Sequence, residues 1–112
     1  MSDCLFCKIV AGEIAAQKVK EDEDFLAFRD INPQAPIHFL AIPKRHVRSL
    51  NESTDAALLG NLLHFARDAA REEELADPGF RVVINTNEHG GQTVFHIHAH
   101  VLGGRALSWP PG

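Results

Sequence analysis

Phe95-His96-Ile97-His98-Ala99-His100-Val101-Leu102 is the stretch that decides the fold, because histidines alternate with apolar residues through it. Alternation with a period of two is typical of a strand that has one covered face. The predicted strand begins at Thr93 and runs to about Leu102. Its three histidines share one face, roughly 7 Å apart from one to the next. Its apolar residues share the other face, where they can pack against a helix.

Around this strand, the sequence predicts two helices and four further strands. The longer helix carries an apolar stripe at helical spacing and follows a capping side chain, Ser53 or Thr54. Runs of strands linked by short turns favour an antiparallel α+β domain. The expected elements, in chain order, are a short helix over 3–12, strands over 16–21, 25–29 and 38–42 (the last stopped by Pro43), the long helix from its cap to about Leu75, a strand over 80–85, a flexible polar loop over 86–92 and the histidine strand.

The length and charge of the chain exclude several classes of protein. Residues 1–112 have the length of a single domain. A formal net charge of -4 argues against a nucleic-acid-binding surface or a polybasic membrane anchor. No apolar run approaches the roughly 18 residues of a transmembrane helix, and the first residues lack the pattern of a secretory signal. We therefore expect a cytoplasmic protein with neither nucleic-acid nor membrane partners.

Three explanations account for three histidines on one strand face. The face can be an ordinary exposed surface, which the preceding Gly90-Gly91-Gln92 loop and the number of histidines make the weakest explanation. Alternating histidines can also share a zinc ion. Alternatively, one neutral imidazole can attack phosphorus, because near pH 7 it needs no second base to deprotonate it. The spacing alone does not separate the last two explanations.

The run from His96 to Gly104 (HIHAHVLGG) resembles the signature of the histidine-triad (HIT) superfamily, and specifically its Hint branch. The resemblance covers essentially the whole chain. It implies an α+β HIT-like fold, with an antiparallel sheet of about five strands, one short N-terminal helix and one long helix, in a homodimer. Further matching segments are Phe28-Arg29-Asp30-Ile31, Pro33-Gln34-Ala35-Pro36, His38-Phe39-Leu40, Ile42-Pro43-Lys44, Gly90-Gly91-Gln92 and the ending Trp109-Pro110-Pro111-Gly112.

The resemblance implies an enzyme that hydrolyses purine nucleoside 5′-phosphoramidates, which are derivatives of AMP or GMP. The implied nucleophile is the middle histidine, His98, which forms a nucleotidyl-histidine that water then hydrolyses. The resemblance assigns to His38 the support of a proton relay. It assigns to His100 a contact with the phosphate and help to the leaving group. No cofactor is required for this chemistry.

The same resemblance implies the nucleotide-binding residues. Asp30 corresponds to the ligand of the ribose hydroxyls. Asn85, Gly91 and Thr93 surround the phosphate, where glycine permits close backbone approach and the side chains donate hydrogen bonds. Trp109 belongs to a C-terminal segment that reaches toward the partner subunit's active site. The implied apolar slot for the base, whose members could equally be core, consists of Phe6, Ile9, Phe28, Ile31 and Leu40.

Cys4 and Cys7 have the spacing of half a zinc site. By resemblance to zinc-binding HIT proteins, the other two ligands are His46 and His96. Two thiolates and two imidazoles would make a closed, structural zinc site that ties the N-terminal helix to the histidine strand. The alternative is a pair of buried thiols that hold no metal.

Two other functions remain open at this point. One is the hydrolysis of dinucleoside polyphosphates, as in the Fhit branch of the superfamily, which the ending Trp109-Pro110-Pro111-Gly112 disfavours. The other is a nucleotide-binding regulatory protein whose catalysis is incidental.

Overall fold

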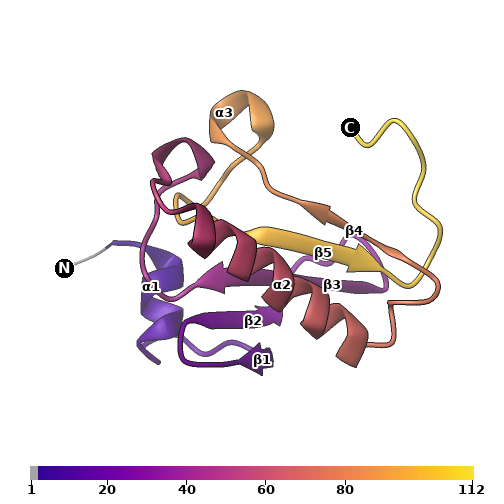
Figure 1. Cartoon of the computed structure of the whole chain (residues 1–112), viewed down its shortest axis with the longest axis horizontal. Helices are drawn as coiled ribbons and strands as arrows, with labels where there is room; N and C mark the ends of the chain where they lie inside the picture. The colour runs from indigo at the N-terminus through magenta and orange to yellow at the C-terminus, as the bar shows by residue number, and fades with distance from the viewer. Residues whose placement is uncertain (1–2) are drawn as a thin grey trace.

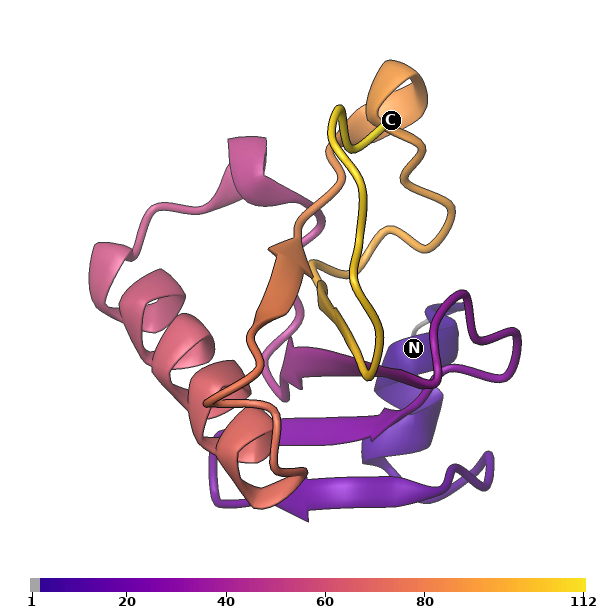
Figure 2. The same cartoon turned by 90° about the vertical axis from the view of Figure 1, so that its right-hand side faces the viewer.

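The computed structural model describes residues 3–112, in which a five-stranded antiparallel sheet carries one helix on each face (Figures 1 and 2). The spatial order of strands is β1-β2-β3-β5-β4, so the strand with the last triad histidine lies inside the sheet. The predicted domain also includes Met1 and Ser2, which lie outside the described residues. The elements are α1 (Leu5–Val10), β1 (Lys18–Glu21), β2 (Phe25–Arg29), β3 (Ile37–Pro43), the 3₁₀ turn η1 (Leu50–Glu52), α2 (Ala56–Glu72), β4 (Phe80–Val83), α3 (Asn87–Gly90) and β5 (Ala99–Gly103).

Helix α2 covers one face of the sheet and α1 covers the other (Figure 2). Successive strand residues point toward these two helices in turn. In β5, Ala99 and Val101 pack against α2, as predicted. His100 points to the opposite side, toward α1. The α2 side buries Phe25, Ala27, Phe39, Ala41, Leu62, Phe65, Ala66, Ala69, Ala70, Leu75, Ala99 and Val101. The α1 side buries Phe6, Ile9, Leu26, Phe28, Leu40 and Ile42.

The predicted strand over 93–102 is wrong in its first half, since β5 begins only at Ala99. The register of the β3–β5 ladder would place Ile97 opposite Pro43. Proline has no backbone N–H to continue such a ladder. The Ile97 N–H instead donates to the Val47 carbonyl oxygen, at 2.7 Å. Two of the three triad histidines therefore lie in an irregular segment just before the strand.

The ends of α2 also differ from the prediction. Asp55, rather than Ser53 or Thr54, is the N-cap, and its carboxylate accepts a backbone N–H of the first helical turn at 3.1 Å. The helix ends at Glu72, short of the predicted end. Glu74 follows with a φ of 64°, a left-handed conformation that cannot continue the helix.

The flexible loop predicted over 86–92 contains a short helix, α3. The side chain of Gln92, 6% exposed, holds it in place. Its Oε1 accepts the Asn87 N–H at 2.9 Å, and its Nε2 donates to the carbonyl oxygens of Arg48 at 2.9 Å and Val94 at 3.1 Å. A buried amide with all these partners makes a rigid support for the histidine segment.

The remaining elements appear where they were predicted, with shifts of one or two residues at their ends. Pro43 is the last residue of β3 rather than the residue after it. The carboxylate of Asp22 closes the acidic turn between β1 and β2 by accepting backbone N–H groups at 2.8 and 2.9 Å. No helix described within residues 3–112 is both long enough and apolar enough to cross a bilayer.

Candidate functional site

A mostly apolar cavity of about 530 Å³ opens between α1 and the sheet. Two of the triad imidazoles reach it, together with all five residues of the predicted base slot. A second and more open cavity, of about 620 Å³, lies along residues 45–56 but contains no triad histidine. The predicted site residues that line the first cavity are Phe6, Ile9, Phe28, Asp30, Ile31, Leu40, Thr93, His98 and His100.

His98 is buried against the wall of this cavity and is only 5% exposed. Its Nδ1 lies 2.8 Å from the backbone carbonyl oxygen of His96. A carbonyl only accepts, so Nδ1 carries the proton and Nε2 holds a lone pair. Burial lowers the pKa of His98, opposed in part by the hydrogen bond to His96 and by the charge of Asp30. The ring is therefore a neutral imidazole at pH 7, in the protonation state that a nucleophile needs.

His38 and His100 form a chain of hydrogen bonds beside His98. The Gln34 backbone N–H donates to His38 Nδ1 at 3.0 Å, so the proton of the neutral His38 ring sits on Nε2. That Nε2 lies 3.0 Å from His100 Nδ1 and donates to it. The proton of His100 is consequently on its Nε2. Burial lowers the pKa of His38 and, together with the neighbouring rings, takes the pKa of His100 to about 4.

Asp30 approaches the same chain, with one carboxylate oxygen 3.4 Å from His38 Nε2. Asp30, His38 and His100 are close enough together to hold a metal ion. However, the Gln34 N–H already occupies the lone pair of His38 Nδ1. A metal on Nε2 would then require a deprotonated imidazole ring, which is costly. The arrangement fits a proton relay better than a metal site.

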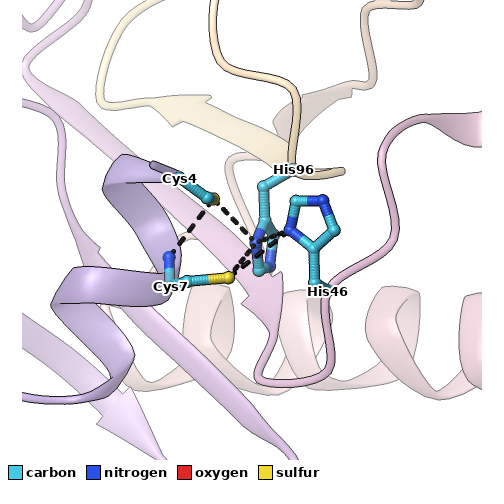
Figure 3. A group of neighbouring side chains, drawn as sticks. All are labelled: Cys4, Cys7, His46 and His96. Atoms are coloured by element: carbon cyan, nitrogen blue, oxygen red, sulfur yellow. Dashed lines mark hydrogen bonds between the residues drawn. The ribbon is translucent and has the colours of Figure 1, made fainter. Parts of the chain in front are cut away.

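Cys4, Cys7, His46 and His96, here called the cysteine–histidine cluster, come together at the start of α1 (Figure 3). His96 Nδ1 lies 3.4 Å from the sulfur of Cys4 and 3.6 Å from that of Cys7. His46 Nδ1 lies 3.4 Å from the Cys7 sulfur and 3.2 Å from His96 Nδ1. The structure thus brings together all four residues of the predicted zinc site.

The spacing within the cluster fits a tetrahedral zinc ion. With Zn–S of about 2.3 Å and Zn–N of about 2.0–2.1 Å, nitrogen ligands lie about 3.3 Å apart and nitrogen–sulfur pairs about 3.6 Å apart. His96 Nε2 donates to the Pro43 carbonyl oxygen at 2.7 Å, which leaves the lone pair of Nδ1 directed at the cluster. Burial takes the pKa of His96 to about 4, so the ring is neutral, as metal binding requires.

The geometry also bears on the hypothesis that the three triad histidines share one metal ion. The His96 ring turns to the cysteines, while Nδ1 of His98 bonds to the backbone. Among residues 3–112, no group of neighbouring metal-ligand side chains includes His98. The three imidazoles of the triad therefore do not converge on one metal-binding point.

Comparison with known proteins identifies the family. Residues 11–107 match the HIT domain family. The chain belongs to the HIT family. A HIT family hydrolase from Legionella pneumophila Philadelphia 1 is 54% identical, with a TM-score of 0.95 over 98% of this chain and 100% of that one. A histidine triad protein from Clostridium difficile is 42% identical, with a TM-score of 0.93 over 96% of each chain. An uncharacterized HIT-like protein of Synechococcus elongatus is 53% identical over 98% of this chain and 97% of its own length.

Three predicted nucleotide-binding residues of this HIT chain lie outside the cavity. Gly91 ends α3 with a φ of 82°, and Asn85 lies half-buried before that helix. Trp109 is 80% exposed, in a tail that ends away from α1 in both views (Figures 1 and 2). Sequence reasoning also missed the backbone partners of the imidazoles, from Gln34 and Pro43, because no side-chain pattern marks a backbone group.

Proposed function

We propose that this HIT protein hydrolyses purine nucleoside 5′-phosphoramidates, as a member of the Hint branch. The observation that carries the proposal is the buried, neutral His98, whose Nδ1–H is bound at 2.8 Å and whose ring lines an apolar cavity. This leaves Nε2 to attack an electrophile bound there. The similarity to a hydrolase from Legionella supports the class of reaction.

In the proposed first step, His98 Nε2 attacks the α-phosphorus and the P–N bond breaks. The new bond makes the imidazole cationic, and the Nδ1–H bond to the His96 carbonyl oxygen stabilises that charge. Water then attacks phosphorus and the P–N bond to His98 breaks, which releases the nucleoside monophosphate. Two moderate barriers replace one high barrier.

The His38–His100 pair supplies and recovers the proton that this cycle needs. An anionic phosphate next to His100 favours protonation of the pair, which the Asp30 carboxylate also stabilises. The pair gives one proton to the departing nitrogen in the first step. It takes one proton from the attacking water in the second. After one turnover the pair therefore holds the same number of protons as at the start.

The cavity walls suit a purine nucleoside. Phe6 and Phe28 meet edge to face, with ring centroids 5.4 Å apart, and present apolar surface to a base. An apolar slot distinguishes adenine from guanine poorly, so both AMP and GMP derivatives are proposed substrates. Asp30 is proposed to accept the ribose hydroxyls, and Thr93 to donate to the phosphate.

Intact-mass spectrometry of quenched reactions tests this function. With adenosine 5′-phosphoramidate, the wild-type chain should carry a transient nucleotidyl adduct. The His98→Ala variant should not, while the matched control His89→Ala, a change on exposed α3, should behave as wild type. Faster turnover of diadenosine triphosphate would favour the Fhit-type activity instead. Full complementation of a deletion strain by His98→Ala would favour a regulatory role.

We further propose that the cysteine–histidine cluster holds a structural zinc ion. With four protein ligands, a tetrahedral zinc has no open position for substrate and supplies rigidity rather than chemistry. This explains why one cluster can join α1, the segment at His46 and the segment at His96. Zinc released by a thiol-modifying reagent, measured with a metal-sensitive dye, should amount to one ion per chain in wild type and none in a Cys4→Ala/Cys7→Ala variant.

We propose, finally, that the protein is a homodimer through α2 and β4. β4 is an edge strand of the sheet, and its Val82 side chain is partly exposed. α2 places Leu63 on its outer surface, 45% exposed. An edge strand with unpaired backbone groups, together with an exposed leucine on the outer side of α2, suits a two-fold contact with a second copy. Such a contact could bring Trp109 to the partner's cavity.

A further inference from the structure

His96 takes part in two sets of contacts at once. Its Nδ1 faces the sulfur atoms of Cys4 and Cys7, at 3.4 and 3.6 Å (Figure 3). Its backbone carbonyl oxygen accepts the Nδ1–H of His98 at 2.8 Å. The ring is fully buried and its Nε2 is bound to the Pro43 carbonyl oxygen, so its position is closely restricted. One residue thus connects the cysteine–histidine cluster to the proposed nucleophile.

The backbone conformation at His96 is fixed by contacts other than strand pairing, because His96 precedes the first residue of β5. The β3–β5 ladder begins at Ala99. Before that point, the Ile97 N–H bonds at 2.7 Å to the carbonyl oxygen of Val47, which is next in sequence to another cluster residue, His46. The direction of the residue 96 carbonyl is therefore set by the cluster and the segment beside it, and not by strand pairing.

Helix α1 makes a second connection between the cluster and the nucleophile. Phe6 lies between the two cysteines in the sequence. Its ring meets the His98 ring edge to face at a centroid distance of 5.1 Å, and the His96 ring at 5.9 Å. The turn of chain that supplies both sulfur atoms therefore also packs against the nucleophile.

We propose that His96 is a positioning residue for His98, and that the ligands of the cysteine–histidine cluster hold it in place. This inference rests on the proposed function, with His98 as nucleophile and zinc in the cluster. With all four ligands engaged, the residue 96 carbonyl stays aimed at Nδ1 of His98, and Nε2 stays aimed at phosphorus. Losing a ligand loosens that carbonyl, while the base-slot residues outside α1, Phe28, Ile31 and Leu40, remain in the sheet and the loop beside it. A nucleophile misplaced by about 1 Å can lose about 100-fold in rate.

Two ligand variants and one control test the proposal. Cys7→Ser removes a sulfur from α1, and His46→Asn removes the exposed ligand, whose loss leaves the buried core intact. Lys8→Ser is the matched control, since it changes α1 outside both the cluster and the cavity. Urea unfolding confirms that each variant is folded before it is compared.

The main readout is the ring N–H proton of His98 in ¹⁵N-edited NMR, assigned by its loss in His98→Ala. In wild type and Lys8→Ser it should be protected from solvent exchange. In both ligand variants it should be lost or exchange faster. The rate of nucleotidyl-histidine formation should fall about 10–100-fold. KM should change by less than this rate, because Phe28, Ile31 and Leu40 of the base slot lie outside α1. Removing zinc from wild type with a chelator should have the same effects, and adding zinc back should reverse them.

The outcomes separate this inference from the proposed function. If the ligand variants keep the protected His98 proton and the wild-type rate, the positioning role is wrong while the proposed hydrolase stands. If instead wild type forms no nucleotidyl-histidine, the proposed function fails, and the NMR readout still decides whether His96 positions His98. A rise in KM with unchanged kcat would also overturn the inference, since it would assign the cluster to substrate binding.

Discussion

His96, His98 and His100 carry the same side chain, yet their two ring nitrogens meet different groups. Nδ1 of His96 faces cysteine sulfur, Nδ1 of His98 donates to a backbone carbonyl oxygen, and Nδ1 of His100 accepts from another imidazole. The partner of one nitrogen determines what the other nitrogen can do. In the proposed function the triad thus divides into a metal-ligand position, a nucleophile and a proton donor, although the sequence presents three equivalent residues.

Replacing the nucleophile should abolish turnover without preventing binding. We expect His98→Ala to lower kcat for adenosine 5′-phosphoramidate by about 10⁴–10⁶-fold, as in other enzymes that lose their nucleophile. Its affinity for AMP, measured by calorimetry, should stay within about tenfold of wild type, because the apolar slot remains. Residual activity within tenfold of wild type would assign the nucleophile elsewhere.

Interrupting the proton relay should matter most for poor leaving groups. The His38→Gln side chain can donate a hydrogen bond to His100 but cannot pass on a proton. For an alkylamine leaving group we expect kcat to fall by about 10²–10⁴-fold, the usual contribution of general acid catalysis. A nitrophenyl ester of AMP, whose leaving group needs no proton, should lose far less. Equal losses for the two substrates would contradict a role in proton transfer.

At the scale of elements, the two main helices are stabilised in different ways. α2 is amphipathic, buries its apolar side against the sheet and carries a side-chain cap. α1 spans only Leu5–Val10, which is too short to be stable alone. It depends on its contacts with the sheet and with the cysteine–histidine cluster. The site is thus built where a short element is held by tertiary contacts.

The contribution of the α2 N-cap to the stability of the protein can be measured directly. We expect Asp55→Ala to lower the free energy of unfolding measurably, because the helix loses the acceptor for its first N–H groups. Thr54→Ala, a change at a residue that does not cap the helix, should have a much smaller effect. Urea denaturation of the two variants measures both effects. If Thr54→Ala lowers the free energy of unfolding more than Asp55→Ala does, then Thr54, one of the two caps predicted from the sequence, caps the helix.

At the scale of the whole molecule, both faces of the sheet are covered but its edges, β1 and β4, are not paired with further strands among residues 3–112. The α2 face contains the larger apolar core, and the α1 face contains the cavity and the imidazoles. The larger core and the proposed active site are therefore on opposite sides of one sheet. The histidines on the cavity side are buried without charge, which makes the stability of the whole chain depend on pH.

Acid should destabilise the fold through His100. Its pKa in the folded chain is about 4, below the value of about 6.5 of an unfolded chain. The unfolded state therefore binds more protons between these values, and stability falls as the pH falls through this window. From pH 7 to pH 5 we expect a loss on the order of 1–2 kcal/mol from this residue. In urea titrations, His100→Asn should show a shallower dependence on pH than wild type.

The proposed dimer predicts that a charge on the edge strand separates the subunits. Val82 lies in β4, with 36% of its surface exposed. Val82→Lys should repel its counterpart across a two-fold contact and halve the mass measured by light scattering. Lys18→Val, on the opposite edge strand, should leave the mass unchanged. If light scattering gives the wild-type protein the mass of a single chain, the proposed dimer is wrong.

Local patterns determined much of this protein in advance. A period of two marked the alternation around His100, helical spacing marked α2, and the spacing of Cys4 and Cys7 marked half of the cluster. These features depend on neighbours in the sequence, so they can be read without a structure. The five-stranded α+β fold follows from them, whereas the residues that line the cavity were indicated by the resemblance to the histidine-triad superfamily.

Contacts between residues that are distant in the sequence, and contacts with backbone groups, could be found only in the tertiary structure. The sulfur of Cys4 meets the His96 ring across 92 positions of sequence, and Pro43 ends the pairing that would have extended β5. The protons of His38 and His98 are placed by a backbone N–H and a backbone carbonyl oxygen. Every residue except proline carries both backbone groups, so only their position in space gives a histidine its role.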